Sequence, residues 1–442
     1  MKWQIRWPGK RVYADAAAAM PLSRAARKEL ARLLRLFGNP SALHQEAVAA
    51  QKELEAARAK VAGAIGAHAD EIIFVGSGTE ANNLALQGVL RPLLLDRGEV
   101  GAVTSAIEHS SVLEPLRALE REGLYVTKLT VDAHGLLDPK QLREAVGEDT
   151  ALLSVQMVNS EMGAVQDIRA IAKELRFIKR GRIPHTRALR AAKDPSLTLA
   201  LRDSAPLYLH TDASQAPLWL PLNVEKLGVD LMTLDAQKVG GPKGIGALYV
   251  RRGTLVEPII WGGGQEAGLR SGTENVAAAG AFAAALVEAA KGCEARALQT
   301  AAVRDFLWSE IQRRIPSAKL NGPACGNNPA GQEKGALRAA RPSLTPFSPA
   351  CRIANNINLI IPGLSGEMAV IALDAGGIAA STRSACDTSS GHPSHMLEAL
   401  GVSPELARSS LRLTLLPTAT RADARTIARA LESIVALYRH VL

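Results

Sequence analysis

One stretch of this 442-residue chain reads Leu231-Met-Thr-Leu-Asp-Ala-Gln-Lys238-Val-Gly-Gly-Pro-Lys-Gly-Ile-Gly-Ala-Leu-Tyr-Val250. It predicts a short apolar strand that runs into Lys238, then a glycine- and proline-rich turn and a second apolar strand. The turn glycines let the backbone bend sharply and pass close to a ligand. A lysine at the end of a buried strand can form a Schiff base with a carbonyl group, although most lysines are solvated surface charges. Lys238 is therefore a candidate nucleophile whose interpretation depends on the rest of the chain.

A second stretch predicts a site for a phosphate group. The residues Glu71-Ile-Ile-Phe-Val-Gly-Ser-Gly-Thr79 and those that follow predict a strand, a glycine turn and a helix. Free N–H groups at the start of such a helix suit a phosphate, and the hydroxyls of Ser77 and Thr79 add further donors. An ordinary strand-to-helix turn would show the same pattern.

A third stretch places an acid at the end of another strand. The run Leu207-Tyr-Leu-His-Thr-Asp212-Ala-Ser-Gln215 is apolar and then abruptly polar. Ligands of open α/β sheets bind at the carboxyl ends of the strands, where Asp212 could keep a cofactor ring nitrogen protonated or simply cap a helix. A phosphate site, an acid and a lysine, in this order on successive strands, together predict a pyridoxal phosphate site.

The chain resembles a known family, the cysteine desulfurases, within the aminotransferase class V branch of the fold-type I pyridoxal phosphate enzymes. The matching segments are Tyr13-Ala-Asp15, Phe37-Gly-Asn-Pro-Ser41, Gly76-Ser-Gly-Thr-Glu-Ala-Asn-Asn83, Ser105-Ala-Ile-Glu-His109, Val158-Asn-Ser-Glu-Met-Gly163, His210-Thr-Asp-Ala-Ser-Gln215, Gly262-Gly-Gly-Gln-Glu-Ala-Gly-Leu-Arg-Ser-Gly-Thr273, Arg383-Ser-Ala-Cys386 and Ser409-Ser-Leu-Arg412. The resemblance implies an α/β fold in which a large domain with a mostly parallel seven-stranded sheet is joined to a small α+β C-terminal domain. We expect residues 20–290 to form the large cofactor-binding domain, and residues 1–19 with 291–442 to form the small domain that carries the catalytic cysteine loop.

The resemblance also implies how the cofactor is held. Lys238 would carry it and move the substrate Cα proton, Asp212 would pair with the pyridine nitrogen, and His109 would stack on the ring and take part in proton transfer. Thr79 and its neighbours would bind the phosphate, and Thr273 would reach the phosphate of the neighbouring subunit. The residues expected to contact the cofactor are Gly78, Thr79, His109, Asn159, Asp212, Gln215, Gln237, Lys238 and Thr273.

For the substrate, the resemblance assigns Asn39, Asn159 and Arg412. Arg412 would hold the substrate carboxylate as a bidentate fork, a geometry that lysine cannot copy. Other interpretations of the same residues remain open, because His109 could be a hydrogen-bonded core histidine and Arg412 could belong to a surface ion pair.

Cys386 decides among the class V chemistries. It lies in Ala380-Ser-Thr-Arg-Ser-Ala-Cys-Asp-Thr-Ser-Ser-Gly-His-Pro-Ser-His395, a small and polar stretch typical of a loop, where a thiol is a better nucleophile than a buried cysteine. By the resemblance, its thiolate attacks the substrate sulfur, alanine is released, and the resulting persulfide is passed to an acceptor. The other cysteines lack this context and are expected to be structural: Cys293, Cys325 and Cys351.

Two positions depart from the family pattern. Asp235-Ala-Gln237 stands where the family usually has Ser-x-His, whose serine and histidine help to hold the phosphate. We expect Asp235 to face away from the phosphate, which its carboxylate would repel, and Gln237 to donate one neutral hydrogen bond. Arg383 stands where glycine is common, and two interpretations are open: it would tighten the loop, or its cation would favour the Cys386 thiolate. Neither change removes a group that breaks bonds, so an enzyme is still expected.

Composition agrees with a two-domain protein of the cytoplasm. The chain is 47% hydrophobic, no apolar run reaches spanning length, and the N-terminus lacks a signal-peptide core. Four cysteines at irregular spacing give neither a zinc pattern nor a disulfide framework, so no metal site is expected. Much of the formal net charge of +9 falls in residues 176–205, a basic insertion without interleaved aromatic residues. A solvated surface is expected there rather than direct nucleic-acid binding, and residues 323–350 predict a second insertion.

Three functions remain open from the sequence. The first is an L-cysteine desulfurase that acts as a homodimer and supplies sulfur to an acceptor protein for iron–sulfur cluster assembly or tRNA thiolation. The second is another class V enzyme, such as a selenocysteine lyase or an aminotransferase, and Cys386 argues against transamination because that reaction needs no thiol. The third is a non-catalytic interaction subunit, which only the changes at Asp235 and Gln237 favour.

Overall fold

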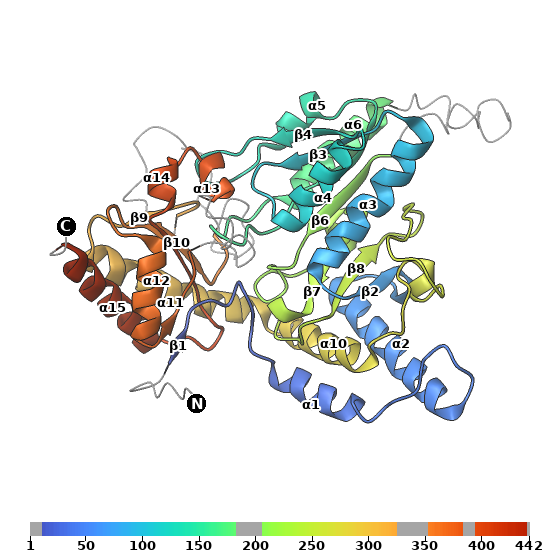
Figure 1. Ribbon diagram of the computed structural model, residues 1–442, viewed down its shortest axis with the longest axis horizontal. Helices are drawn as coiled ribbons and strands as arrows, with labels where there is room; N and C mark the ends of the chain where they lie inside the picture. The colour runs from blue at the N-terminus through green and yellow to red at the C-terminus, as the bar shows by residue number, and fades with distance from the viewer. Residues whose placement is uncertain (1–10, 183–205, 325–351, 383–393, 440–442) are drawn as a thin grey trace.

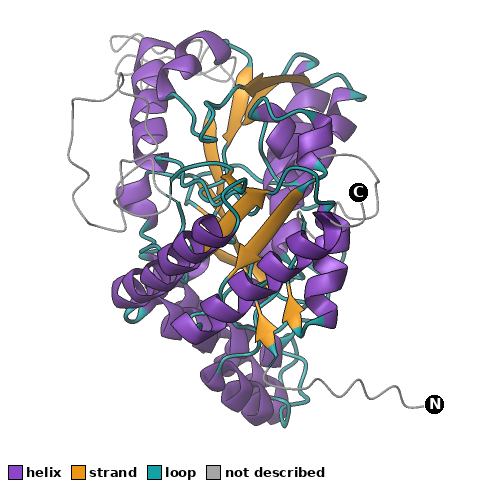
Figure 2. Ribbon diagram, turned by 90° about the vertical axis from the view of Figure 1, so that its left-hand side faces the viewer, coloured by secondary structure: helices purple, strands orange, loops and turns teal. Residues whose placement is uncertain are grey.

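The computed structural model describes residues 11–182, 206–324, 352–382 and 394–439. A central sheet with helices packed on both faces forms the larger part, and a smaller sheet with its own helices lies beside it (Figures 1 and 2). The basic insertion is helical over residues 176–182, where it ends α6 (Ile168–Arg182). The rest of that insertion and most of the second one lie outside the described residues.

The central sheet has seven strands in the spatial order β2-β8-β7-β6-β5-β3-β4. In that order they are Ile72–Val75, Gly246–Val250, Leu231–Asp235, Tyr208–Asp212, Thr150–Ser154, Gly101–Ser105 and Tyr125–Leu129. Strand β8 is antiparallel to both β2 and β7, and the other neighbours are parallel. Strands β5 and β7 are buried along their whole length, as expected where helices cover both faces. The predicted mostly parallel seven-stranded sheet is confirmed.

Helices connect these strands and cover the sheet. They are α1 (Arg24–Leu33), α2 (Gln45–Ile65), α3 (Gly78–Arg97), α4 (Ser110–Glu120), α5 (Leu142–Ala145), α6, α9 (Val224–Leu227) and α10 (Val276–Ala290). Helices α1 and α2 pack against α10, whose small alanine side chains allow close approach. The start of α3 is fixed by Ser77, an extended N-cap residue whose Oγ accepts a hydrogen bond from Glu80 N. This cap places the first turn of α3 at the end of β2.

The smaller part is built from C-terminal elements and the beginning of the chain. Its antiparallel sheet has the order β12-β10-β9 (Ser410–Thr414, Asn356–Ile360 and Lys319–Leu320), and its helices are α11 (Cys293–Arg314), α12 (Gly366–Ala375), α13 (His395–Ala399), α14 (Pro404–Ala407) and α15 (Arg421–Arg439). Strand β1 (Val12–Tyr13) pairs in parallel with β11 (Ile378–Ala379). This part has its own core, which includes Leu307, Leu359 and Ile427.

A sharp bend between α10 and α11 joins the two parts. The helix axes bend by 73° between α10 and α11. Gly292, at φ +66°, is the N-cap residue of α11. The predicted boundary near residue 290 falls at this bend, and the division into two domains stays a prediction. Among the described residues no single helix is long and apolar enough to cross a membrane; α10 and α11 meet that length and composition only when taken together as a bent pair.

Candidate active site

The start of α3 forms a cup of backbone donors, which we call the α3 cup and define as residues 76–80. The first N–H groups of a helix have no acceptor within the helix and carry its positive end, so they attract anions. Thr79 is exposed in the first turn, and Gly78 is buried against a neighbouring strand end. The Glu80 carboxylate occupies the first N–H group of the cup, because it accepts hydrogen bonds from Gly76 N (2.7 Å) and from Arg270 Nε (2.8 Å).

Asp235 faces the α3 cup, and the expectation that it would face away is wrong. A Cβ built on Gly78 would lie 3.0 Å from Asp235 Cβ and 3.3 Å from Asp235 Oδ2. Gln237 is also not aimed at the cup as a donor, since its Nε2 donates to Asp235 Oδ2 at 3.1 Å. The reason is local: Asp235 caps the short 3-10 helix η3 (Ala236–Lys238), and its Oδ1 accepts from Gln237 N.

A chain of hydrogen bonds links Asp212 to His109. Asp212, at the end of β6, accepts from Asn82 Nδ2 (2.8 Å) and from Ser214 N (2.9 Å). Asn82 Nδ2 also donates to Ser111 Oγ at 2.8 Å, and that hydroxyl lies 2.8 Å from His109 Nδ1. His109 is the N-cap of α4 and is half-buried. The acid and the histidine that the sequence predicted are therefore brought together by Asn82 and Ser111.

Lys238 and Gln215 meet at the backbone of the N-terminal segment. Lys238 Nζ donates to Ala17 O (2.8 Å) and Ala18 O (2.7 Å), and Gln215 Nε2 donates to the same Ala17 O at 2.9 Å. The N-terminal segment thus packs against the carboxyl edge of the central sheet. Asp212 ends β6 and Gln215 follows it, while Lys238 follows the adjacent strand β7, as the sequence predicted.

Arg412 lies on β12 and is buried, with 1% of its surface exposed, so the surface ion-pair interpretation is wrong. Its Nη2 pairs with Asp15 Oδ1 at 2.9 Å, and its Nη1 donates to Ser160 O at 3.1 Å. Its Nε is buried without a partner among the described residues. The guanidinium therefore keeps one donor for a further anionic group beside the Asp15 carboxylate.

Cys386 and Arg383 lie outside the described residues, in the segment 383–393, but both ends of that segment are anchored. On the N-terminal side, Ser381 exchanges backbone hydrogen bonds with Arg412. On the C-terminal side, Ser394 Oγ donates to the carboxylate of Glu161, and His395 Nε2 lies 3.0 Å from Glu108 O, one residue before His109. The segment therefore leaves the described structure next to Arg412 and re-enters it next to His109.

Three predicted site residues are placed less directly. Asn159 is buried, and its Oδ1 accepts from the backbone N–H groups of Glu161 and Met162. Asn39 is exposed, and its Oδ1 accepts from Ser41 N at 3.0 Å. Thr273 is exposed after Gly272, whose φ is +120°. These contacts orient loops, and the proposed cofactor and substrate contacts of the three residues stay predictions.

Two buried titratable groups lie behind the site. Burial raises the pKa of Glu108 to about 8, while hydrogen bonds from Ser105 Oγ and Gln156 N act in the opposite direction. Burial lowers the pKa of His210 to about 4. His210 lies between Ser154 Oγ and Thr233 Oγ1, on the three central strands β5, β6 and β7. Near neutral pH, these directions favour the uncharged form of both groups, Glu108 in the loop after β3 and His210 on β6.

The residues at this edge fit pyridoxal phosphate. An anion-binding helix start, an acid held by two donors and a lysine amine are the groups that its phosphate, ring nitrogen and aldehyde require. Asn82 Oδ1 is buried and has no partner among the described residues, which leaves one acceptor available beside Asp212. Sequence reasoning missed Asn82, Ser111 and Ser214. Only the position of Asn82, one turn after Gly78 on the buried face of α3, gave a signal.

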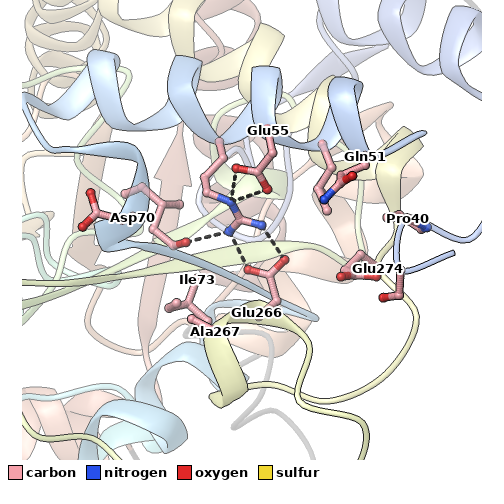
Figure 3. Close-up of a pocket in the computed structure, with 12 residues that line it drawn as sticks. Pro40, Gln51, Glu55, Asp70, Ile73, Glu266, Ala267 and Glu274 are labelled. Atoms are coloured by element: carbon pink, nitrogen blue, oxygen red, sulfur yellow. Dashed lines mark hydrogen bonds and ion pairs between the residues drawn. The ribbon is translucent and has the colours of Figure 1, made fainter. Parts of the chain in front are cut away.

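A cavity of about 300 Å³ lies elsewhere, between α2 and the loop that precedes α10 (Figure 3). Within it, the Arg58 guanidinium forms a buried ion pair with Glu266, whose carboxylate also accepts from Phe74 N. Glu266 and Ala267 have φ values of +51° and +57°, which is unusual for residues other than glycine. The pair therefore holds the loop that leads to Thr273 in a strained conformation, and this cavity is separate from the Lys238 site.

Comparisons with known proteins agree with these features. The sequence model of the family described as aminotransferase class-V matches residues 12–181 and 195–331. The chain is 35% identical over 433 residues to the cysteine desulfurase IscS of Dictyoglomus turgidum, with 98% of this chain and 96% of that protein covered. It is 34% identical over 433 residues to the IscS-like cysteine desulfurase of Mycobacterium tuberculosis, with 97% of each covered.

Solved structures give the same result. A NifS-like protein is similar with a TM-score of 0.79 at 27% identity, over 97% of this chain and 100% of that one. SspA in complex with cysteine is similar with a TM-score of 0.70 at 29% identity, over 92% of this chain and 100% of that one.

Proposed function

The chain belongs to the aminotransferase class-V family and is one of its pyridoxal phosphate-dependent cysteine desulfurases, and we propose that it takes the sulfur of L-cysteine onto Cys386 as a persulfide. In this reaction the Cys386 sulfur forms a bond to the substrate sulfur, and the substrate Cβ–Sγ bond breaks. The electron pair of that bond stays on carbon, which gains a proton and leaves as L-alanine. Atoms and electrons balance without an external oxidant or reductant.

One observation carries this proposal: Lys238, Asp212 and His109 share one edge of the sheet, and the segment with Cys386 is anchored there at both ends. Pyridoxal phosphate, when bound, supplies an electron sink for the carbanion at the substrate Cα. Asp212 holds the proton on the ring nitrogen, and the donors Asn82 and Ser214 N fix the direction of its carboxylate.

The other residues bind substrate and move protons. Lys238 Nζ, which donates to the carbonyls of Ala17 and Ala18, would hold the cofactor through its aldehyde and would move the substrate Cα proton. Ser111 orients His109 through Nδ1, so that the imidazole can lie on the ring and pass a proton. Arg412 binds the substrate carboxylate through Nε, the edge that no described residue occupies, while Asp15 keeps Nη2 in place.

The test separates cofactor chemistry from sulfur transfer. With L-cysteine alone, the parent enzyme should release alanine and gain the mass of one sulfur on the peptide with Cys386; with an added thiol reductant, which reduces the persulfide, it should also release sulfide. Cys386→Ser should retain cofactor absorbance and gain no sulfur, whereas Lys238→Ala should lose turnover altogether. Lys243→Ala, an exposed lysine of the same turn, and Cys293→Ser, a buried cysteine, are the matched controls and should behave like the parent. A sulfur adduct on Cys293, Cys325 or Cys351 would contradict the assignment of the nucleophile.

The active unit that we propose is a homodimer. Support comes from large apolar side chains that a single chain leaves exposed: Phe37 by 85%, Leu43 by 96% and Trp261 by 76%. Their loops meet at the cavity of Figure 3, which Pro40, Ser41 and Glu274 line together. In this arrangement Thr273 would face the phosphate of the partner subunit.

The acceptor that we propose is a protein of iron–sulfur cluster assembly or tRNA thiolation, on the strength of the resemblance to the cysteine desulfurases. A cytoplasmic location stays a prediction from the sequence.

A further inference from the structure

The carboxyl group of Asp235 lies beside the first residue of α3. Asp235 is 7% exposed, and its Oδ2 would lie 3.3 Å from a Cβ on Gly78, the first residue of α3. Ser214 Oγ also lies close to the same point, 3.1 Å from that Cβ. The carboxyl and a phosphate bound by the α3 cup would therefore be neighbours at the positive end of one helix.

Few charges surround this carboxyl, and they act in opposite directions. Burial raises the pKa of Asp235, the Lys238 ammonium lowers it, and Asp212 at the end of β6 raises it. On α3 the nearest acid is Glu80, which is paired with Arg270 and turned toward Gly76. The remaining contacts of Asp235 are the neutral N–H groups of Gln237. Among the described residues, none forms a salt bridge with Asp235.

We propose that Asp235 is a phosphate-binding residue of this enzyme in its protonated form, so that binding of the cofactor takes up a proton. The carboxyl O–H donates a hydrogen bond to a phosphate oxygen, which a hydroxyl or imidazole would otherwise supply. A carboxylate cannot do this, because it has no proton to donate and carries the same sign of charge as the phosphate. The inference deepens the proposed function, because it concerns the cofactor of the same site.

A measurable consequence follows from linkage between protonation and binding. The phosphate of the cofactor is mostly a dianion above about pH 6. If only the protonated Asp235 accepts it, the dissociation constant rises about tenfold per pH unit once the pH exceeds the Asp235 pKa of the cofactor-free enzyme. Unphosphorylated pyridoxal reaches Lys238 and Asp212 and leaves the α3 cup empty, so its affinity should not share this dependence on Asp235.

The experiment titrates the full-length, cofactor-free chain with pyridoxal phosphate and with pyridoxal, from about pH 6 to about pH 9. Absorbance gives both dissociation constants, and their ratio cancels the pH effects of Lys238 and the ring. Calorimetry in two buffers of different ionisation enthalpy counts the protons taken up. The variants are Asp235→Asn and Asp235→Ser. The matched control is Asp138→Asn, because Asp138 also caps a 3-10 helix through an Oδ1 that accepts from residue i+2 (Lys140 N, 3.0 Å), and that helix contributes no residue to the candidate site.

In the parent and in Asp138→Asn, the preference for the phosphorylated form should fall about tenfold per pH unit above the Asp235 pKa, with up to one proton taken up. Both Asp235 variants should hold the cofactor with a flat ratio and without that proton. Equal slopes and equal proton counts in the parent and the Asp235 variants would overturn the proposal. If Asp235→Asn does not fold by circular dichroism, Asp235→Ser decides in its place. A protein that shows this proton linkage but does not turn over L-cysteine would refute the proposed function and leave this inference intact.

Discussion

Glu108 is a carboxyl that the fold holds in its uncharged form. Burial raises its pKa from an ordinary 4.5 to about 8. A raised pKa in the folded state means that protonation favours folding, so this contribution is complete below about pH 4.5 and is lost as the pH rises through about 8. Replacing Glu108 with Gln removes the ionisation and keeps the size. The variant should gain unfolding free energy relative to the parent between these pH values, on the order of a few kcal/mol.

Urea unfolding at a series of pH values measures this gain. Glu120→Gln, at the exposed end of α4, should follow the pH profile of the parent. The change of unfolding free energy with pH is the decisive quantity, because a purely structural role of Glu108 would change the unfolding free energy equally at every pH. Parallel profiles for Glu108→Gln and the parent would show that the buried carboxyl does not titrate in this range.

At the scale of single residues, the sequence predicted which side chains carry chemistry better than it predicted where they point. Lys238 and Asp212 lie at the ends of apolar runs that clearly predict strands, and the structure places both residues at the carboxyl edge of the central sheet. Asp235 was expected to face away from the phosphate, but a strand ends at this residue and the alternation of faces stops. The direction of its side chain depends on contact with Gly78 from a distant helix.

At the scale of elements, two glycines on consecutive helices of the chain should respond in opposite ways to alanine. Gly78 begins α3, and a Cβ there would lie 3.0 Å from Asp235 Cβ and 3.1 Å from Ser214 Oγ. Gly63 is exposed inside α2, and no atom lies within 4 Å of its Cβ position. Gly78→Ala should lose roughly 1–3 kcal/mol of stability and bind the cofactor more weakly. Gly63→Ala should gain about 0.5–1 kcal/mol through helix propensity alone.

Thermal unfolding with and without pyridoxal phosphate distinguishes the two variants. The stabilisation by cofactor should be smaller in Gly78→Ala than in the parent and unchanged in Gly63→Ala. If Gly78→Ala retains the full cofactor-dependent shift, the strand end bearing Asp235 yields to the added methyl group, and the α3 cup is less rigid than its packing indicates.

The strand–turn–helix unit of β2 and α3 was predictable because its signals are local, namely an apolar run, two glycines and a capping serine. The order of the strands was not predictable from such signals. Strand β8 lies antiparallel between β2 and β7, although along the chain β2 is the first of these seven strands and β8 is the last. The resemblance to a family implied a mostly parallel seven-stranded sheet, but neither it nor side-chain periodicity predicted this strand order.

At the scale of the whole molecule, the exposed apolar side chains make the assembly state testable. Phe37→Asp combined with Trp261→Asp should convert a dimer to monomers, because two charges would have to be buried at the interface. Leu437→Asp is the control, since Leu437 is 64% exposed on α15, in the other part of the molecule (Figure 1). Sedimentation velocity at assay concentration gives the masses. A fully active monomer, in parent or variant, would refute the contribution of Thr273 to a partner site.

The pairing of β1 with β11 sets the order in which the protein can be completed during synthesis. Val12 pairs with Ile378 in the parallel ladder of β1 and β11. A few residues later, the carbonyls of Ala17 and Ala18 accept hydrogen bonds from Lys238. The beginning of the chain therefore has no strand partner until the ribosome has added about 366 further residues. At roughly 5–20 residues per second, this takes on the order of half a minute. Throughout that time β1 exposes unpaired backbone N–H and C=O groups, so completion of this fold depends on the late synthesis of β11.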